Sequence, residues 1–177
     1  MNLRIDDEIL VRECVTSDAE IIHNSFATQG YYLRQWLPVA AIFNTVDDVA
    51  DYIYYASMEN VFLFSIEYKQ QFAGMISMSA FSSINQSAEL GYWLRKEFQG
   101  KGIMTRSLQA IIQQAYDKKR INRLVIKCAT ENFSSQRIPE KLGFTYEGTE
   151  RDGEKSADGY FVDLKVYSRL KNDKQKL

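Results

Sequence analysis

The sequence predicts a single α/β domain, an α/β (α+β) fold in which a mixed central sheet has helices on both faces. A chain of 177 residues can bury one sizeable core and is short for two, so one domain is expected over residues 1–177. Residues 61–68 and 72–81 are rich in branched and aromatic side chains, and the polar residues between them predict a hairpin. A strand, a glycine-rich turn and an amphipathic helix follow over residues 88–116, as in a crossover between parallel strands.

The chain is expected to begin with one strand and one helix. Residues 9–15 are apolar and branched and predict the strand. Residues 16–18, Thr-Ser-Asp, can cap a helix over residues 19–27, because their side-chain oxygens accept hydrogen bonds from free N–H groups of the first turn. Gly30 ends this helical pattern.

An aromatic segment and a further helix come before the hairpin. Residues 31–37 stop at Pro38, which disfavours a helix at the residue before it. Thr45 predicts the start of the next helix. Its inward-facing residues are expected to include Val49, Ile53 and Ala56.

The middle of the chain supplies the centre of the sheet. Residues 88–94 predict a strand antiparallel to the one before it, and residues 123–129 a strand parallel to 88–94. The helix between them carries its apolar residues at three- and four-residue spacing, which defines one face: Met104, Leu108, Ile111, Ile112, Ala115 and Tyr116.

The last third predicts one short helix and two strands. The helix covers residues 134–142 and ends at Gly143, and the strands cover residues 144–149 and 160–170. The sheet is therefore expected to have about seven strands. Two polar segments are expected to be mobile, namely the connection over residues 148–159 and the tail over residues 171–177.

Composition excludes several classes of function. Lys plus Arg number 22 and Asp plus Glu 23, so no global field attracts nucleic acid or an anionic membrane, and direct nucleic-acid binding is not expected. The N-terminus lacks the apolar stretch of a signal peptide, and no segment is apolar enough to span a membrane. A cytoplasmic protein is expected.

The two cysteines and the single histidine do not predict a metal site or a Cys/His nucleophile. Cys14 and Cys128 each lie in an apolar segment and are expected to be reduced core thiols. His23 lies in a helical pattern, and one histidine without clustered cysteines does not form a structural zinc site.

The turn over residues 99–102, Gln-Gly-Lys-Gly, lies where a helix begins. The first helical turn leaves N–H groups unpaired, and glycines let the backbone approach an anion closely, so the turn favours a phosphate site. A tight strand-to-helix connection explains the same residues equally simply. Neither a P-loop nor a dinucleotide fingerprint is present.

Several spaced motifs together resemble one family over nearly the whole chain. They are Glu89 to Leu94 (ELGYWL), Gln99 to Met104 (QGKGIM), Asn132-x-x-Ser135, Glu140 to Phe144 (EKLGF), Tyr32 to Pro38 (YLRQWLP) and Tyr160 to Asp163 (YFVD). With these motifs the sequence resembles the GNAT (Gcn5-related) N-acetyltransferases. Within that superfamily it is most similar to the RimJ/RimL branch, whose members acetylate the N-termini of ribosomal proteins.

The resemblance implies acetyl-CoA as co-substrate, no metal, and strands splayed at the acetyl-CoA site. The pantetheine arm would pair with backbone around Tyr92, Trp93 and Leu94 and contact Asn132, whose other role is that of a turn residue. The pyrophosphate would bind at Gln99, Gly100, Lys101, Gly102, Ile103, Met104 and Thr105. Met104 departs from the Gly or Ala usual at the last motif position, and the Lys101 side chain either meets a phosphate or is exposed.

Two residues are the candidate catalytic groups. Glu89 is expected to be partly desolvated on the central strand and to act as a base through a water; the alternative is a surface glutamate paired with a lysine or arginine. Ser135 is the candidate donor to the departing thiolate, by a proton or only a hydrogen bond; the alternative is helix capping. Many GNAT enzymes have a tyrosine acid four residues later, where this chain has Pro139.

The resemblance puts the acceptor groove at Tyr31, Tyr32, Trp36 and the connection over residues 148–159. An α-amine titrates near 7.7 to 8.0 and a lysine amine near 10.4, so deprotonating lysine at neutral pH costs roughly 3 to 4 kcal/mol more. The function expected is direct transfer of acetyl to a primary amine, in particular a protein N-terminus.

Two alternatives stay open. One is acetylation of a small amine such as a polyamine, an amino acid or an aminoglycoside, and the other is a non-catalytic acyl-CoA-binding regulator. Glu89→Gln would separate enzyme from regulator, because an enzyme would lose kcat but keep CoA affinity. The aromatic content is compatible with a homodimer, although aromatic residues equally fill cores.

Overall fold

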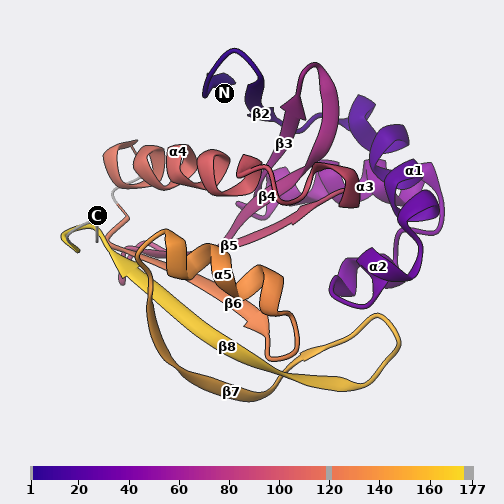
Figure 1. Cartoon of the computed structure of the whole chain (residues 1–177). Coiled ribbons are helices and arrows are strands. Elements are labelled where there is room, and N and C mark those ends of the chain that lie inside the picture. The colour runs from indigo at the N-terminus through magenta and orange to yellow at the C-terminus, as the bar shows by residue number, and fades with distance from the viewer. Residues whose placement is uncertain (1, 119–120, 174–177) are drawn as a thin grey trace.

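The computed structural model of the protein describes residues 2–118 and 121–173. Over these residues the strands form one eight-stranded sheet in the order β1-β2-β3-β4-β5-β6-β8-β7 (Figure 1). The strands are β1 (Asn2–Arg4), β2 (Ile9–Glu13), β3 (Phe62–Tyr68), β4 (Gln71–Ser82), β5 (Ser87–Leu94), β6 (Arg123–Ala129), β7 (Thr145–Lys155) and β8 (Phe161–Leu170). The mixed α/β class is confirmed. The eighth strand is β1, which at three residues is too short to show a period in the sequence.

Helices cover both faces of this sheet. They are α1 (Ala19–Gln29), α2 (Tyr31–Arg34), α3 (Val46–Met58), α4 (Ile103–Lys118) and α5 (Phe133–Lys141), with 3-10 turns η1 (Thr16–Asp18), η2 (Pro38–Ala41) and η3 (Lys96–Phe98). Residues of α4 share one buried cluster with β2 to β6, whereas α1 and α3 share another with the opposite side of β3 and β4.

Alternation along the strands produces these two cores. Successive side chains of a strand point to opposite faces, so Leu63 belongs to the α1/α3 cluster while Phe64 belongs to the α4 cluster. Met75 and Ile76 on β4 divide in the same way. The central strands are therefore apolar on both faces, and their position is fixed by burial from both sides.

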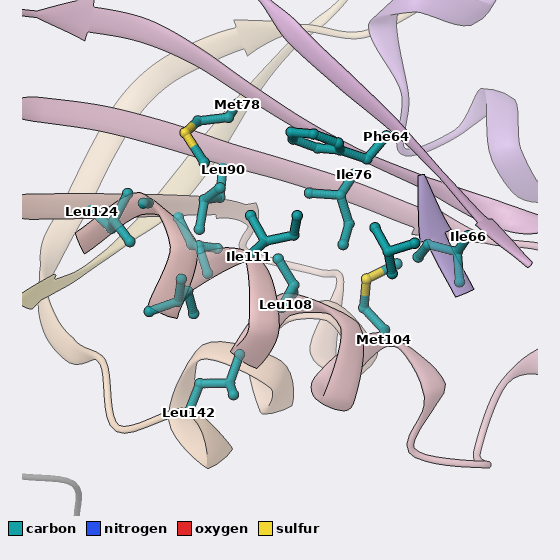
Figure 2. Packing of buried hydrophobic residues seen from close by; sticks show 14 of the residues in the cluster. Phe64, Ile66, Ile76, Met78, Leu90, Met104, Leu108, Ile111, Leu124 and Leu142 are labelled. Carbon is teal, nitrogen blue, oxygen red and sulfur yellow. The ribbon is translucent and has the colours of Figure 1, made fainter. Parts of the chain in front are cut away.

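The predicted apolar face of α4 packs onto the sheet. Leu108 and Ile111 are completely buried and lie against Ile76 and Leu90 of the central strands (Figure 2). This contact fixes where α4 begins, directly after the glycine-rich turn.

The first half of the chain differs from prediction at two places. Asp18 makes no cap hydrogen bond to α1, because its carboxylate is bound by Arg12 at 2.7 Å and by the Val15 N–H at 2.9 Å. A one-turn helix, α2, forms within the aromatic segment, and the chain becomes extended only at Leu37, before the proline. Thr45 begins α3 as predicted, accepting a hydrogen bond from the backbone N–H three residues on.

The prediction of a polar connection over residues 148–159 is wrong for most of its length. Strand β7 continues to Lys155, with register shifts between Tyr146 and Gly148 and between Glu150 and Glu154. These bulges interrupt the alternation by which a strand is recognised, so the segment looked like a loop. At the C-terminus Lys171 donates to the Tyr116 carbonyl at 3.0 Å, while residues 174–177 of the predicted tail lie outside the described residues.

The parallel pair in the centre of the sheet is joined at one end only. Strands β5 and β6 pair in parallel at Ser87, Ala88 and Glu89, opposite Arg123 to Val125, and nowhere beyond. Both strands continue for several residues after the last pair. The expected splay therefore opens after Glu89, and backbone groups that a complete parallel ladder would pair are left facing a gap.

Candidate active site

A pocket of about 420 Å³ occupies the splay between β5 and β6. Its walls come from β5 and β6, the turn before α4, the first turn of α4, one side of α5, and α2, with Glu154 and Leu164 of the β7–β8 pair. The predicted site residues that line it are Tyr32, Trp36, Glu89, Tyr92, Trp93, Leu94, Gln99, Gly100, Gly102, Ile103, Met104, Thr105, Asn132 and Ser135.

The glycine-rich turn fits a phosphate group. Gly100 and Gly102 have φ of +72° and +70°, which favours glycine, and no atom lies within 4 Å of where a Cβ would stand on either. The backbone is therefore bare on the side facing open space, and α4 begins at once with its free N–H groups. Met104 does not obstruct this cradle, because its side chain is 4% exposed and packs in the core (Figure 2).

Gly91 on β5 lies close to a side chain of the neighbouring strand. A Cβ there would stand 2.6 Å from the Ser77 hydroxyl of β4. A larger residue at position 91 would therefore require the Ser77 side chain of the neighbouring strand to shift.

Two of the predicted site residues, Lys101 and Tyr31, do not line the pocket. The Lys101 ammonium lies over the rings of Tyr68 and Phe98, 5.7 and 5.6 Å from their centroids, so its charge is held on the outer side of the turn. Tyr31 is 71% exposed and does not line the pocket. The turn therefore presents backbone groups, and not the Lys101 ammonium, to the pocket.

Tyr32 connects helix α2 to the glycine-rich turn. The Gln99 amide donates to the Tyr32 hydroxyl and, at 3.3 Å, to the carbonyl of Leu94. Gln29 at the end of α1 accepts from the Lys96 N–H and donates to Glu97, both at 2.9 Å. Helices α1 and α2 are thus held against the segment that leads into the glycine-rich turn.

Glu89 is the last residue of β5 that pairs with β6, opposite Val125, and Lys127 lies two residues further along β6. Its carboxylate is 3.7 Å from the Lys127 ammonium, and its side chain is 36% exposed. Lys127 makes a shorter bond, 2.8 Å, to Glu150. Glu89 therefore lines the pocket and is loosely paired with a lysine, and its role as a base stays a prediction.

A second carboxylate, Glu154, was missed in the sequence. It lines the pocket from β7, just after the bulge at residues 151–153. Burial, and then repulsion from Glu89, raise the pKa of Glu154 above its ordinary value, although Lys127 opposes the shift. Its only signal was its place in the segment that the family resemblance assigned to the acceptor groove.

Ser135 is free of the capping role. Asn132 begins α5 and accepts the Ser135 N–H with its own side chain at 3.2 Å. The Ser135 hydroxyl lies 3.3 Å from the Tyr92 hydroxyl and 3.3 Å from the Cys128 sulfur. Burial raises the pKa of Cys128, so this sulfur remains a thiol at neutral pH.

Two features are absent from the described part of the chain. Within residues 2–118 and 121–173, no cluster of three or more His, Cys, Asp or Glu side chains is placed to hold a metal ion. No helix of the same residues is both long enough and apolar enough to cross a membrane.

Comparison with known proteins identifies the family. Residues 8–145 match the family model described as an acetyltransferase (GNAT) domain. The chain belongs to the GNAT acetyltransferase family. It is therefore an N-acetyltransferase, and acetyl-CoA is its co-substrate, as the resemblance predicted.

Three similar proteins each match 96% of this chain. YdaF of Bacillus subtilis (strain 168), named for ribosomal N-acetyltransferase activity, is 32% identical over 176 residues, 96% of this chain and 95% of that protein. One similar structure is that of RimL, a ribosomal L7/L12 α-N-protein acetyltransferase in complex with CoA in a disulfide to the protein. It has a TM-score of 0.90 and 26% sequence identity, and the match covers 96% of this chain and 98% of that chain. A second is that of an acetyltransferase from Salmonella typhimurium that modifies the N-terminal serine of ribosomal protein L7/L12. It has a TM-score of 0.87 and 26% sequence identity, and the match covers 96% of this chain and 99% of that chain.

Proposed function

We propose that this enzyme transfers acetyl from acetyl-CoA directly to the N-terminal α-amine of a ribosomal protein in the cytoplasm. One observation carries the proposal: a single pocket connects the phosphate-fitting turn of α4 to the carboxylates Glu89 and Glu154 at the other side of the splay. A donor and an amine can then meet without a covalent enzyme intermediate. The named activities of YdaF and of the two ribosomal-protein acetyltransferases support the acceptor class.

The donor end is assigned to backbone groups. Gly100, Gly102 and the first N–H groups of α4 would hold the pyrophosphate, and the exposed edge of β5 from Tyr92 to Leu94 would pair with the pantetheine amides. Acetyl-CoA supplies an activated acyl group with a thiolate as leaving group. A backbone N–H of β5 near Leu94 is the group proposed to polarise the thioester carbonyl.

The acceptor end is assigned to the two carboxylates. Glu154 is the better proton acceptor, because its raised pKa matches a base more closely than that of an ordinary glutamate. Glu89, 3.7 Å from the Lys127 ammonium, is placed to attract the ammonium of the incoming N-terminus or to position a water. The base predicted at Glu89 thus becomes a pair.

Lys127 disfavours polyamine acceptors. Its ammonium lines the same pocket and lies within reach of both Glu89 and Glu150, so it offsets part of the negative charge that a polycation requires. A single α-amine, with a pKa near 7.7 to 8.0, carries at most one positive charge and needs less negative charge in the pocket.

Thiol release from acetyl-CoA, followed with a thiol-reactive dye, tests the proposal. The acceptor panel contains a peptide with the N-terminal serine sequence of ribosomal L7/L12, its N-blocked form, a lysine peptide with a blocked N-terminus, spermidine and free amino acids. Turnover is expected with the free N-terminal peptide and not with its blocked form. Turnover with spermidine or an amino acid alone would replace the acceptor class, and CoA binding without any turnover would favour a regulator.

A further inference from the structure

The Tyr92 hydroxyl reaches from β5 to the first turn of α5 and meets one residue twice. It donates to the Ser135 carbonyl at 2.9 Å, and its oxygen accepts from the Ser135 hydroxyl at 3.3 Å. The two residues are 43 positions apart and both line the pocket. Nothing in the sequence pattern of either element predicts this contact.

Pro139 explains why the Ser135 carbonyl is available. In an α-helix this carbonyl would accept the N–H of residue 139, but proline has no N–H. The Tyr92 hydroxyl supplies the missing donor. Because a carbonyl without a partner inside the protein is costly, the tyrosine is firmly anchored by its bond to the backbone.

The anchored oxygen is the strongest partner of the Ser135 hydroxyl among the described residues. Its other neighbour, the Cys128 thiol, is a weak hydrogen-bonding group. Burial raises the pKa of Tyr92 well above its ordinary value, so at neutral pH the group keeps its hydrogen and does not act as a phenolate.

We propose that Tyr92 is a positioning residue for Ser135, holding the serine hydroxyl at the point of the pocket where the CoA thiolate departs. The inference rests on the proposed function and on the role predicted for Ser135 as donor to that thiolate. Ser135 turns its O–H from Tyr92 to the sulfur as charge develops there. Tyr92 keeps its own hydrogen on the Ser135 carbonyl, so the serine stays in place; one hydrogen bond changes partner, and no O–H bond breaks.

A double-mutant cycle tests the inference in steady-state kinetics. Tyr92→Phe removes only the hydroxyl and is expected to lower kcat about tenfold, on the scale of one hydrogen bond, while KM for acetyl-CoA stays within about twofold. Ser135→Ala is expected to lower kcat at least as much. The double variant is expected to be no slower than Ser135→Ala alone, because Tyr92 acts through the serine.

Tyr167→Phe is the matched control. Tyr167 is also buried and presents its hydroxyl near Glu140 on α5, at 3.5 Å, but it does not line the pocket. This variant is expected to keep wild-type kcat. A merely structural tyrosine would not produce the coupling with Ser135.

Two results would overturn the inference: wild-type kcat in Tyr92→Phe, or losses in the two single variants that multiply in the double variant. The cycle is measured on whichever amine of the acceptor panel the wild-type enzyme acetylates. Failure of the N-terminal substrate in that panel therefore counts against the proposed function alone, and the Tyr92 result is read separately.

Discussion

At the scale of single residues, the acceptor end holds two glutamates that differ in environment. Glu89 lies on the central strand with Lys127 3.7 Å away, whereas Glu154 follows a bulge and has a raised pKa caused first by burial. Opposed environments of this kind assign different tasks to groups of the same chemistry.

Glu154→Gln is expected to remove the base. In the wild type, kcat is expected to rise with pH through an apparent pKa above 4.5, because Glu154 must lose its proton before it can accept one. In the variant, kcat is expected to fall about 100-fold or more and to lose this acidic limb. A pH series of initial rates measures both.

The matched control is Glu150→Gln, which removes the carboxylate bonded to Lys127 outside the pocket. It is expected to leave the pH profile in place. An unchanged acidic limb in Glu154→Gln would transfer the role of base to Glu89.

Asp18 is a nearly buried carboxylate whose charge is expected to stabilise the fold. Burial alone would raise the pKa of Asp18, but hydrogen bonds from Arg12 and from the Val15 N–H outweigh burial and lower it below 3.8. Asp18→Asn removes the nearly buried partner of Arg12, which keeps its ion pair with Glu67 at 2.6 Å, and is expected to destabilise the fold by about 2 kcal/mol at pH 7. Urea unfolding of both proteins gives the difference.

The pH dependence of that difference follows from the direction of the shift. A carboxylate with a lowered pKa in the folded state stabilises the protein above its unfolded pKa, and the contribution is lost as the pH falls through the folded value. The wild type is therefore expected to lose its advantage over Asp18→Asn below about pH 4. Asp51→Asn, at an exposed position on α3, is the control, and a pH-independent difference would contradict the assignment.

How far the sequence predicts individual site residues depends on whether the backbone or the side chain matters. The turn at Gly100 and Gly102 was predictable, because positive φ requires glycine and the order of elements placed it before a helix. The destination of the Lys101 side chain was not, since it depends on Tyr68, a residue from a distant strand. The roles assigned to Glu89 and Ser135 remain predictions.

At the scale of elements, regular segments were predicted well and irregular ones poorly. Strand β6 and helix α3 follow their sequence patterns closely, because one apolar period runs through each. Strand β7 has bulges where Gly148 and residues 151–153 break that period, and Asp152 adopts φ of +49° with its N–H bonded to Asp163. Those bulges bring Glu154 to the pocket, so the feature that hid the strand also places a functional side chain.

The turn before α4 gives a prediction at this scale. Gly102→Ala puts a methyl group on a backbone with φ of +70°, at an estimated cost of about 1 kcal/mol, and projects it into the open space of the cradle. The Kd for CoA, measured by calorimetry, is expected to rise about tenfold or more as the backbone donors are screened.

Gly159→Ala is the control for backbone strain. Gly159 also has positive φ, +92°, and open space around its Cβ position, but it lies in the turn between β7 and β8. It is expected to lower stability similarly and to leave CoA affinity unchanged. Equal CoA affinity in Gly102→Ala and wild type would contradict binding at this turn.

At the scale of the whole molecule, the pocket lies in the splay between β5 and β6 and is bordered by the long β7–β8 pair. Arg34 of α2 bonds the Asp158 carboxylate at 2.9 Å and the Ala157 carbonyl at 3.3 Å, connecting residues more than 120 positions apart across the acceptor side. No local pattern predicts such a contact, because it depends on how β7 and β8 extend from the sheet (Figure 1).

Asp158→Asn tests this connection. The pair is exposed, with side chains 45% and 40% accessible, so the change is expected to cost less than about 1 kcal/mol of stability. KM for the acceptor peptide is expected to rise severalfold, because the turn between β7 and β8 is released, while KM for acetyl-CoA stays constant. A rise in both KM values would show that the contact serves the fold in general.

The position of the transferred acetyl group tests the central claim most directly. A peptide with a free N-terminal serine and an internal lysine is incubated with the enzyme and isotopically labelled acetyl-CoA, and fragmentation mass spectrometry locates the label. The α-amine is expected to carry all of it, since its pKa lies more than two units below that of lysine. Label on the lysine, or none on a peptide that releases CoA thiol, would contradict N-terminal acetylation.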